Sequence, residues 1–178
     1  LDIWGRIRRS SEAARADMLA SDAVRRGVVL SLVSSVAEKY FELRELDLEL
    51  EIAHATVASF TETLDIFQRQ FEGGVASRLD ALRTEAALAQ AAASIPDLER
   101  RVFAKENELS LLLGRPPAEV PRGMALVDQW LPPEVPVGVP SDLLARRPDL
   151  VEVEQRLVTQ NALVGVALAD FFPRIGLT

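Results

Sequence analysis

The chain has 178 residues, a formal net charge of −7, an isoelectric point of about 4.9 and no cysteine. Phosphate binding needs a basic face, so the acidic balance argues against nucleic acid as a partner. Without cysteine there is no disulfide, thiol nucleophile or cysteine zinc site, and the redox compartment stays open. No apolar run has the length of a membrane-spanning helix. Because Leu1 follows no charged and apolar leader, we expect a processed or excised segment.

Residues 1–5 alternate between apolar and polar side chains and end at a glycine, which predicts the end of a strand. Two interpretations stay open for this stretch. It is a frayed terminus, or it is the end of a membrane-barrel strand with Trp4 in the aromatic girdle and the following arginines at headgroup level. Residues 174–178 are predicted to begin another strand.

Residues 10–72 are predicted to form one long helix. Ser10 offers an N-cap for it, and an earlier start near Arg6 stays open. Along this helix, apolar residues recur at a mean interval of 3.5 residues. This is the period of a coiled coil. The helix would be ~95 Å long, so it needs a partner along its whole length. The predicted seam consists of Val29, Val33, Val36, Tyr40, Leu43, Leu46, Leu50, Ala53, Val57, Phe60, Leu64, Phe67 and Phe71.

Gly73 and Gly74 are predicted to end this helix, because glycine adopts positive φ at low cost. Ser77 is expected to cap a return helix over residues 77–113, with Asp80 at the third position of a capping box. The first apolar row of the return helix is Leu88, Ile95, Val102 and Leu109, and the second is Ala91, Leu98 and Leu112, interrupted by Lys105.

Residues 115–140 hold seven of the ten prolines, which predicts an extended, ordered connector. Its apolar residues are expected to lie against a helical surface; they are Met124, Leu126, Val127, Trp130 and Leu131. A third helix is predicted over residues 141–170. Pro148 either lies in its first turns or separates a short helix from a longer one that begins at Asp149. One face carries Leu150, Val153, Leu157, Asn161, Val164 and Leu168.

The predicted lengths suggest how the helices combine. The return helix and the third helix would be ~55 Å and ~45 Å long, and together they match the first helix. Both run opposite to it, so we expect them to stack end to end as one interrupted partner. The predicted fold class is all-α, with a long antiparallel coiled-coil hairpin and a third helix stacked on the return helix, in a single domain over residues 1–178.

Four stretches resemble the outer-membrane efflux factors of the TolC type, in the lipoprotein branch that serves resistance-nodulation-division pumps. They are FEGGVASRLDAL at 71–82, LSLLLGRPP at 109–117, VPVGVPSDLLARRPDL at 135–150 and ADFFPRI at 169–175. The third and fourth stretches are quite specific, and the resemblance covers essentially the whole chain.

The resemblance implies a homotrimer whose protomers contribute strands to an outer-membrane β-barrel and helices to a periplasmic α-barrel. It places residues 10–113 in the first hairpin of a two-half repeat, 115–140 in the equatorial connector and 141–170 at the start of the second half. The family's gating carboxylates lie in the second hairpin, so none is assigned here.

The function that the resemblance implies is a passive exit duct for small molecules such as drugs, in the multidrug-resistance systems of the bacterial outer membrane. Its expected partners are a periplasmic adaptor (membrane fusion) protein and an inner-membrane resistance-nodulation-division pump. The hairpin tip would dock to the adaptor through Phe71, Gly74, Ser77 and Asp80, although turn and capping roles explain the glycine and the serine equally well. The family favours Arg-Tyr before this turn, where this chain has Gln70 and Phe71.

Two other functions stay open: a periplasmic coiled-coil adaptor or scaffold, and the outer-membrane component of type I secretion. An enzyme is not expected. His54 is the only histidine and has no nucleophile or metal ligand at a useful spacing. Gly73-Gly74 follows a helix, not the strand that a phosphate-binding loop requires. We therefore predict no catalytic residue, cofactor or metal.

Overall fold

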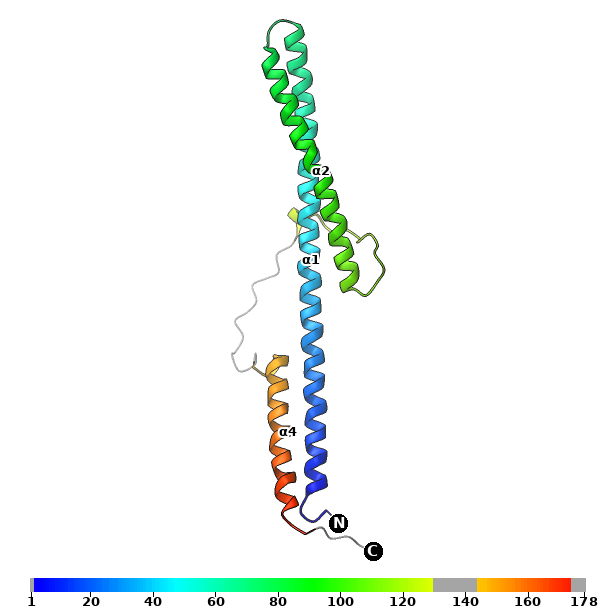
Figure 1. The fold of residues 1–178 in the computed structure, drawn as a ribbon, viewed down its shortest axis with the longest axis vertical. Helices are drawn as coiled ribbons and strands as arrows, with labels where there is room; N and C mark the ends of the chain where they lie inside the picture. The colour runs from blue at the N-terminus through cyan, green and yellow to red at the C-terminus, as the bar shows by residue number, and fades with distance from the viewer. Residues whose placement is uncertain (1, 130–143, 174–178) are drawn as a thin grey trace. The chain divides into compact units, whose positions relative to one another are not determined.

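The computed structural model describes residues 2–129 and 144–173, and in these ranges it contains helices and no strand. The helices are α1 (Arg6–Glu72), α2 (Arg78–Leu112), the 3₁₀ helix η1 (Leu126–Asp128) and α4 (Pro148–Asp170) (Figure 1). The chain divides into two compact units, one of residues 1–33 with 132–178 and one of residues 34–131. The all-α fold class predicted from the sequence is confirmed.

α1 begins at Arg6, the earlier of the two starts that the sequence leaves open, because Asp2 caps it. The Asp2 carboxylate accepts hydrogen bonds from the backbone N–H groups of Ile7 and Arg8, both at 3.0 Å. Gly5 adopts φ +76°, which reverses the chain between Asp2 and the helix. Residues 2–5 therefore form a turn, in place of the strand end that their alternation predicts. Residues 174–178, the other predicted strand, lie outside the described residues.

In the first unit, α1 and α4 run antiparallel (Figure 1). They meet through small side chains. Thr159 Oγ1 lies 3.5 Å from the backbone oxygen of Ala13, so a side chain of one helix reaches the backbone of the other. A Cβ added to Gly27 would lie 3.8 Å from Pro148, and one added to Gly165 would lie 3.1 Å from Arg9. The buried residues of this contact are alanines: Ala13, Ala16, Ala20, Ala23, Ala162 and Ala169.

Pro148 separates a short helical stretch from the longer α4, which is the second of the two predicted alternatives, with α4 beginning at Pro148 rather than at Asp149. Residues 144–146 are helical, but Arg147 leaves the helical conformation with φ −71° and ψ 120°. The reason is steric, because the residue before a proline avoids the α region. Pro148 then lies at the first position of α4, where its missing N–H costs nothing.

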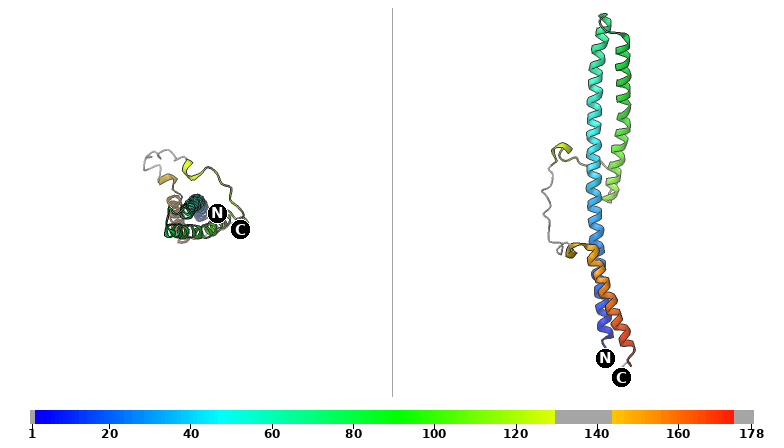
Figure 2. Two further views of the ribbon diagram at one scale, coloured as in Figure 1. Left: turned by 90° about the horizontal axis from the view of Figure 1, so that it is seen from above. Right: turned by 90° about the vertical axis from the view of Figure 1, so that its left-hand side faces the viewer.

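In the second unit, α1 and α2 form an antiparallel hairpin, seen side by side in both figures (Figure 1, Figure 2). Its buried core consists of Leu43, Leu109 and Val120, with Val36, Tyr40 and Val102 packed against them. The predicted seam from Val36 to Phe67 is buried or half-buried. Val29 and Val33, which the sequence places on the same seam, belong to the first unit and are exposed.

The chain after α2 is attached to the hairpin by polar contacts, and among the predicted apolar residues that the structure describes only Leu126 is half-buried. The N–H of Gly123 donates to the Tyr40 hydroxyl at 2.9 Å, and Arg44 donates to the carbonyl of Met124 at 3.2 Å. The side chains of Met124 and Val127 are exposed. The apolar anchor is instead Val120, which the seam pattern does not indicate, while Trp130 and Leu131 lie outside the described residues.

Candidate functional site

The hairpin tip, residues 71–82, is the part of the molecule for which the sequence predicts a binding role. α1 ends at Glu72, and the N–H groups of Val75 and Ala76 both donate to the carbonyl of Gln70, at 2.8 and 3.1 Å. Gly74 adopts φ +73° with no atom within 4 Å of its missing side chain. The turn therefore needs glycine for its backbone conformation, and space around it is open.

Ser77 and Asp80, two of the four predicted tip residues, contact each other. Ser77 Oγ donates to the Asp80 carboxylate at 2.7 Å and accepts from the Asp80 N–H at 3.3 Å. This is a capping box with aspartate in place of glutamate, and the acidic side chain lies in the first turn, where it complements the helix dipole. Ser77 is exposed and Asp80 is half-buried, so the capping role leaves the pair partly accessible to a partner.

The tip also exposes apolar side chains that sequence reasoning missed. Phe71 was predicted and is 44% exposed, but Val75 is 82% exposed and was not singled out. Leu79 and Leu82 are exposed on the first turns of α2. The pattern that could have identified Val75 is its place between Gly74 and the N-cap Ser77, where no helix can bury it. Exposed apolar side chains thus lie in the same segment as the four predicted residues.

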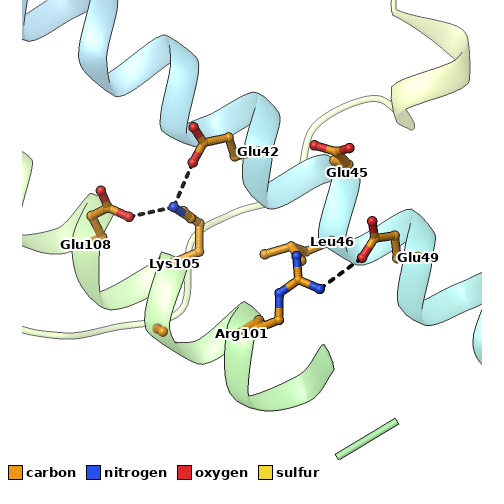
Figure 3. Close-up of a pocket in the computed structure, with 8 residues that line it drawn as sticks. Glu42, Glu45, Leu46, Glu49, Arg101, Lys105 and Glu108 are labelled. Atoms are coloured by element: carbon orange, nitrogen blue, oxygen red, sulfur yellow. Dashed lines mark hydrogen bonds and ion pairs between the residues drawn. The ribbon is translucent and has the colours of Figure 1, made fainter. Parts of the chain in front are cut away.

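A cleft between α1 and α2 holds the charged groups of the hairpin (Figure 3). Lys105 Nζ lies 2.7 Å from both Glu42 and Glu108, and Arg101 reaches Glu49 at 3.4 Å. Lys105 interrupts an apolar row in the sequence, and this pairing explains why: its ammonium bridges the two helices. The cleft therefore holds the helices in register by ion pairs.

The electrostatics of this cleft favour the charged forms. Hydrogen bonds from Lys105 and Lys39 lower the pKa of Glu42 below its ordinary value. Hydrogen bonds to Glu108 and Glu42 raise the pKa of Lys105, and those to Glu42 raise that of Lys39. These three groups stay ionised at neutral pH and form a structural ion-pair network.

A second charged cluster holds the connector after α2. Arg122 Nε and Nη2 donate to the two oxygens of Asp47 at 2.9 and 3.1 Å, and Nη1 donates to Glu106 Oε1 at 2.5 Å. The hydrogen bonds to Asp47 raise the pKa of Arg122 further above its already high value. Glu106 is buried and also accepts from the N–H of Val120 at 3.3 Å. One arginine thus ties the connector to both helices of the hairpin.

Large apolar side chains cover the outer faces of the first unit. On α4, the face predicted from the sequence is exposed at each of its apolar positions; these are Leu150, Val153, Leu157, Val164 and Leu168. The corresponding stretch of α1 exposes Val24, Val28, Val29, Leu30, Leu32 and Val33. Large exposed apolar patches mark sites of contact with further protein, and these faces have that character.

The described residues contain no group of histidine, cysteine, aspartate and glutamate side chains that could hold a metal ion. His54 is exposed on α1. Among the described helices, none combines the length and the low charge content needed to span a bilayer.

Comparison with known proteins identifies relatives of the chain. Residues 1–115 match the family model described as outer membrane efflux protein. The whole chain is 38% identical to the solvent efflux pump outer membrane protein SrpC of Pseudomonas putida and covers 38% of it. It is 32% identical to the cation efflux system protein CusC of Escherichia coli, covering 39% of that protein.

Solved structures show the same fold. A crystal structure of CusC matches 97% of this chain and 40% of its own length, with a TM-score of 0.84 and 30% identity. The outer-membrane channel OprN matches 97% of this chain and 39% of its own, with a TM-score of 0.79 and 34% identity. The chain therefore spans less than half the length of the relatives it matches.

Proposed function

The chain belongs to the outer membrane efflux protein family, and from this premise we propose that it forms part of the channel component of a tripartite efflux system. Its helices would build the periplasmic wall of a passive duct through which small molecules such as drugs leave the cell. The wall would form from copies of the chain in a homotrimer at the outer membrane. An adaptor in the periplasm and an inner-membrane resistance-nodulation-division pump would complete the system.

The observation that carries this proposal is the exposed apolar surface of the first unit. α1 and α4 contact each other through alanine and glycine, and leave their large side chains, such as Leu157 and Val164, outside. A pair of helices that buries its small residues and exposes its leucines is suited to neighbours on its outer faces. Copies of the same chain would supply such neighbours and close a wall.

The hairpin tip is the surface that we propose for the adaptor. Phe71, Gly74, Ser77 and Asp80 form the turn and its cap, and Val75 adds the most exposed apolar side chain there. The main affinity would come from the apolar side chains, and the cap would hold the backbone in place. We propose no catalytic role, so the energy for transport would come from the pump.

The two alternative functions have less support. Family membership favours a channel component over an adaptor or scaffold. The matched relatives carry the word efflux in their names, which favours drug or solute efflux over type I secretion.

Assembly is tested by placing a charge on the exposed face of α4. Val164→Arg is expected to disrupt the oligomer, since the residue is 59% exposed in one chain but would be covered between copies. Gln160→Arg, at an exposed polar position of the same helix, is the matched control. Light scattering of the purified protein measures the oligomer, and ethidium accumulation in cells measures efflux. The proposal fails if Val164→Arg assembles and exports as well as Gln160→Arg.

Tip docking is tested with one introduced cysteine, which is unique because the chain has none. Ser77→Cys is expected to cross-link to the adaptor of the same pump in an active complex. Ala93→Cys, exposed in the middle of α2, is the control and should not cross-link. An active pump in which neither position cross-links would exclude the tip as the docking surface.

A further inference from the structure

A groove lies between the last third of α2 and the chain that follows it, within the second unit. α2 lines it with Val102, Phe103 and Asn107, whose spacing of one and four residues places them on one side of the helix. Residues 117–119 line the opposite side. The groove has a volume of about 550 Å³, which is in the range of sites that hold one drug-sized molecule.

The wall formed by residues 117–119 is fixed to α2 by hydrogen bonds. Ser110, which is fully buried, donates to the carbonyl of Ala118 and accepts from its N–H, both at 3.4 Å. The buried Glu106 accepts from the N–H of Val120 at 3.3 Å. These bonds hold one wall against the other, so the groove exists before any ligand binds.

The groove also contains side chains that the hairpin itself does not use. The Phe103 ring is 66% exposed, although its neighbour Val102 packs against the buried core. The carboxylate of Glu119 and the carboxamide of Asn107 are exposed, and neither makes a hydrogen bond or an ion pair with a residue that the structure describes. An aromatic ring, a carboxylate and an amide in the same groove are thus open to a ligand.

The charge balance of the groove is negative. Of the three charged side chains that line it, Glu106 and Glu119 are acidic and Arg122 is basic. Arg122 pairs with Glu106 and also with Asp47, so its charge is already compensated. Glu119 therefore contributes a negative charge that none of the described residues neutralises.

We propose that this groove, lined by Val102, Phe103, Asn107, Pro117 and Glu119 and here named the connector groove, binds a drug-sized organic cation with an aromatic or apolar body. A positive charge is attracted both to the face of a phenylalanine ring and to an unpaired carboxylate. Phe103 and Glu119 supply these two contacts. Val102 and Pro117 cover the apolar body, and the Asn107 oxygen accepts a hydrogen bond from an amino group. The inference goes beyond the proposed function, which assigns no ligand site to the hairpin.

The ring and the charge together favour an organic cation over other ligands. An inorganic cation would use Glu119 but not Phe103. A neutral apolar molecule would use the ring and would leave the carboxylate against an apolar surface without a counterion. An anion would meet an uncompensated negative charge. A molecule that joins an apolar body to a positive charge uses both features.

The test measures binding of ethidium, an aromatic cation, to the purified 178-residue chain by fluorescence anisotropy. Saturable binding is expected. Phe103→Ala should weaken it about tenfold, because the cation–π contact and the apolar cover are both lost. Glu119→Gln keeps the shape and removes the charge, and it should weaken binding about threefold, as expected for an exposed ion pair. Phe103→Leu keeps an apolar side chain without a ring, so its affinity should lie between those of the parent and Phe103→Ala.

The matched controls are Leu111→Ala and Glu99→Gln, which make the same kinds of change at exposed positions of α2 outside the groove. Both should bind ethidium as the parent does, and circular dichroism verifies that each variant keeps its helices. The inference is overturned if the parent does not bind, or if the controls lose as much affinity as the groove variants. It is also overturned if the anionic dye fluorescein binds as tightly as ethidium and depends equally on Phe103.

Light scattering of the same samples distinguishes a ligand site from a contact between copies of the chain. Phe103→Ala is expected to leave the oligomer unchanged. A variant with an altered oligomer and the parent's ethidium affinity would overturn the inference, because the ring would then face a second copy. Ethidium binding is measured without membrane or pump, so its failure would leave the proposed function standing.

Discussion

Replacing Ala16 by leucine tests whether α1 and α4 meet through their small residues. Ala16 is 3% exposed, and its neighbour Ala13 lies within reach of Thr159 from α4. Three added carbons have no space there, so the helices must separate or strain. Overpacking of a filled contact costs about 1–3 kcal/mol, and about 2 kcal/mol is expected here. Alanine and leucine have almost the same helix propensity, so the loss of stability measures the packing effect alone.

The assay is hydrogen exchange of the amides of α4, because only the first unit should respond. A loss of about 2 kcal/mol predicts roughly 30-fold faster exchange in residues 148–170. Ala14→Leu is the matched control, because Ala14 is exposed on the same helix and a leucine there meets solvent. If both variants exchange alike, the alanine contact does not hold the helices and the packing argument is refuted.

Two further predictions concern the hairpin of the second unit. Arg122→Ala should lower the free energy of unfolding in urea by about 2 kcal/mol, because it leaves the buried Glu106 without its cation. The control Arg100→Ala removes an exposed arginine that pairs with Asp97, and it should cost under about 0.5 kcal/mol. Equal costs would contradict a role for the cluster. Because the pKa of Glu42 is lowered in the folded state, its contribution to stability is present above the ordinary glutamate value of about 4.3 and is lost as the pH falls through the folded pKa. The urea midpoints at pH 5.5 and 3.0 should therefore differ less in Glu42→Gln than in the parent. An unchanged difference would count against the Lys105 bridge.

The helix ends of this chain are predictable because local chemistry sets them. Ser77 with Asp80 predicts an N-cap, and these two side chains make its hydrogen bonds. Gly74 predicts a turn, and it adopts positive φ. The sequence leaves the start of α1 open between Ser10 and Arg6 because Ser10 is as good a cap as Asp2, and only the folded chain shows which side chain reaches the backbone. The stacking of α4 on α2 and the contact role of the tip stay predictions.

The side chains that join the helices could not be predicted in the same way. Lys105 interrupts an apolar row, and its partner Glu42 is 63 residues away. Arg122 and Asp47 are 75 residues apart, so nothing in the connector's prolines indicates that an ion cluster holds it. Val120 and Val75 were missed because their environment comes from segments distant in sequence or from a turn.

The amino-acid sequence by itself determined the helices of this protein, their limits at Ser77, Gly74 and Pro148, and the coiled-coil seam of the hairpin, because caps, glycine conformations and apolar periods act within a few turns of the chain. Only the tertiary structure decided which faces meet. The apolar row of α4 suggested its contact face, but α4 buries alanines against α1 and exposes its leucines. In the sequence, a stripe of alanines indicates only a high helix propensity. The stripe forms a packing contact only when another backbone comes so close that no larger side chain would fit.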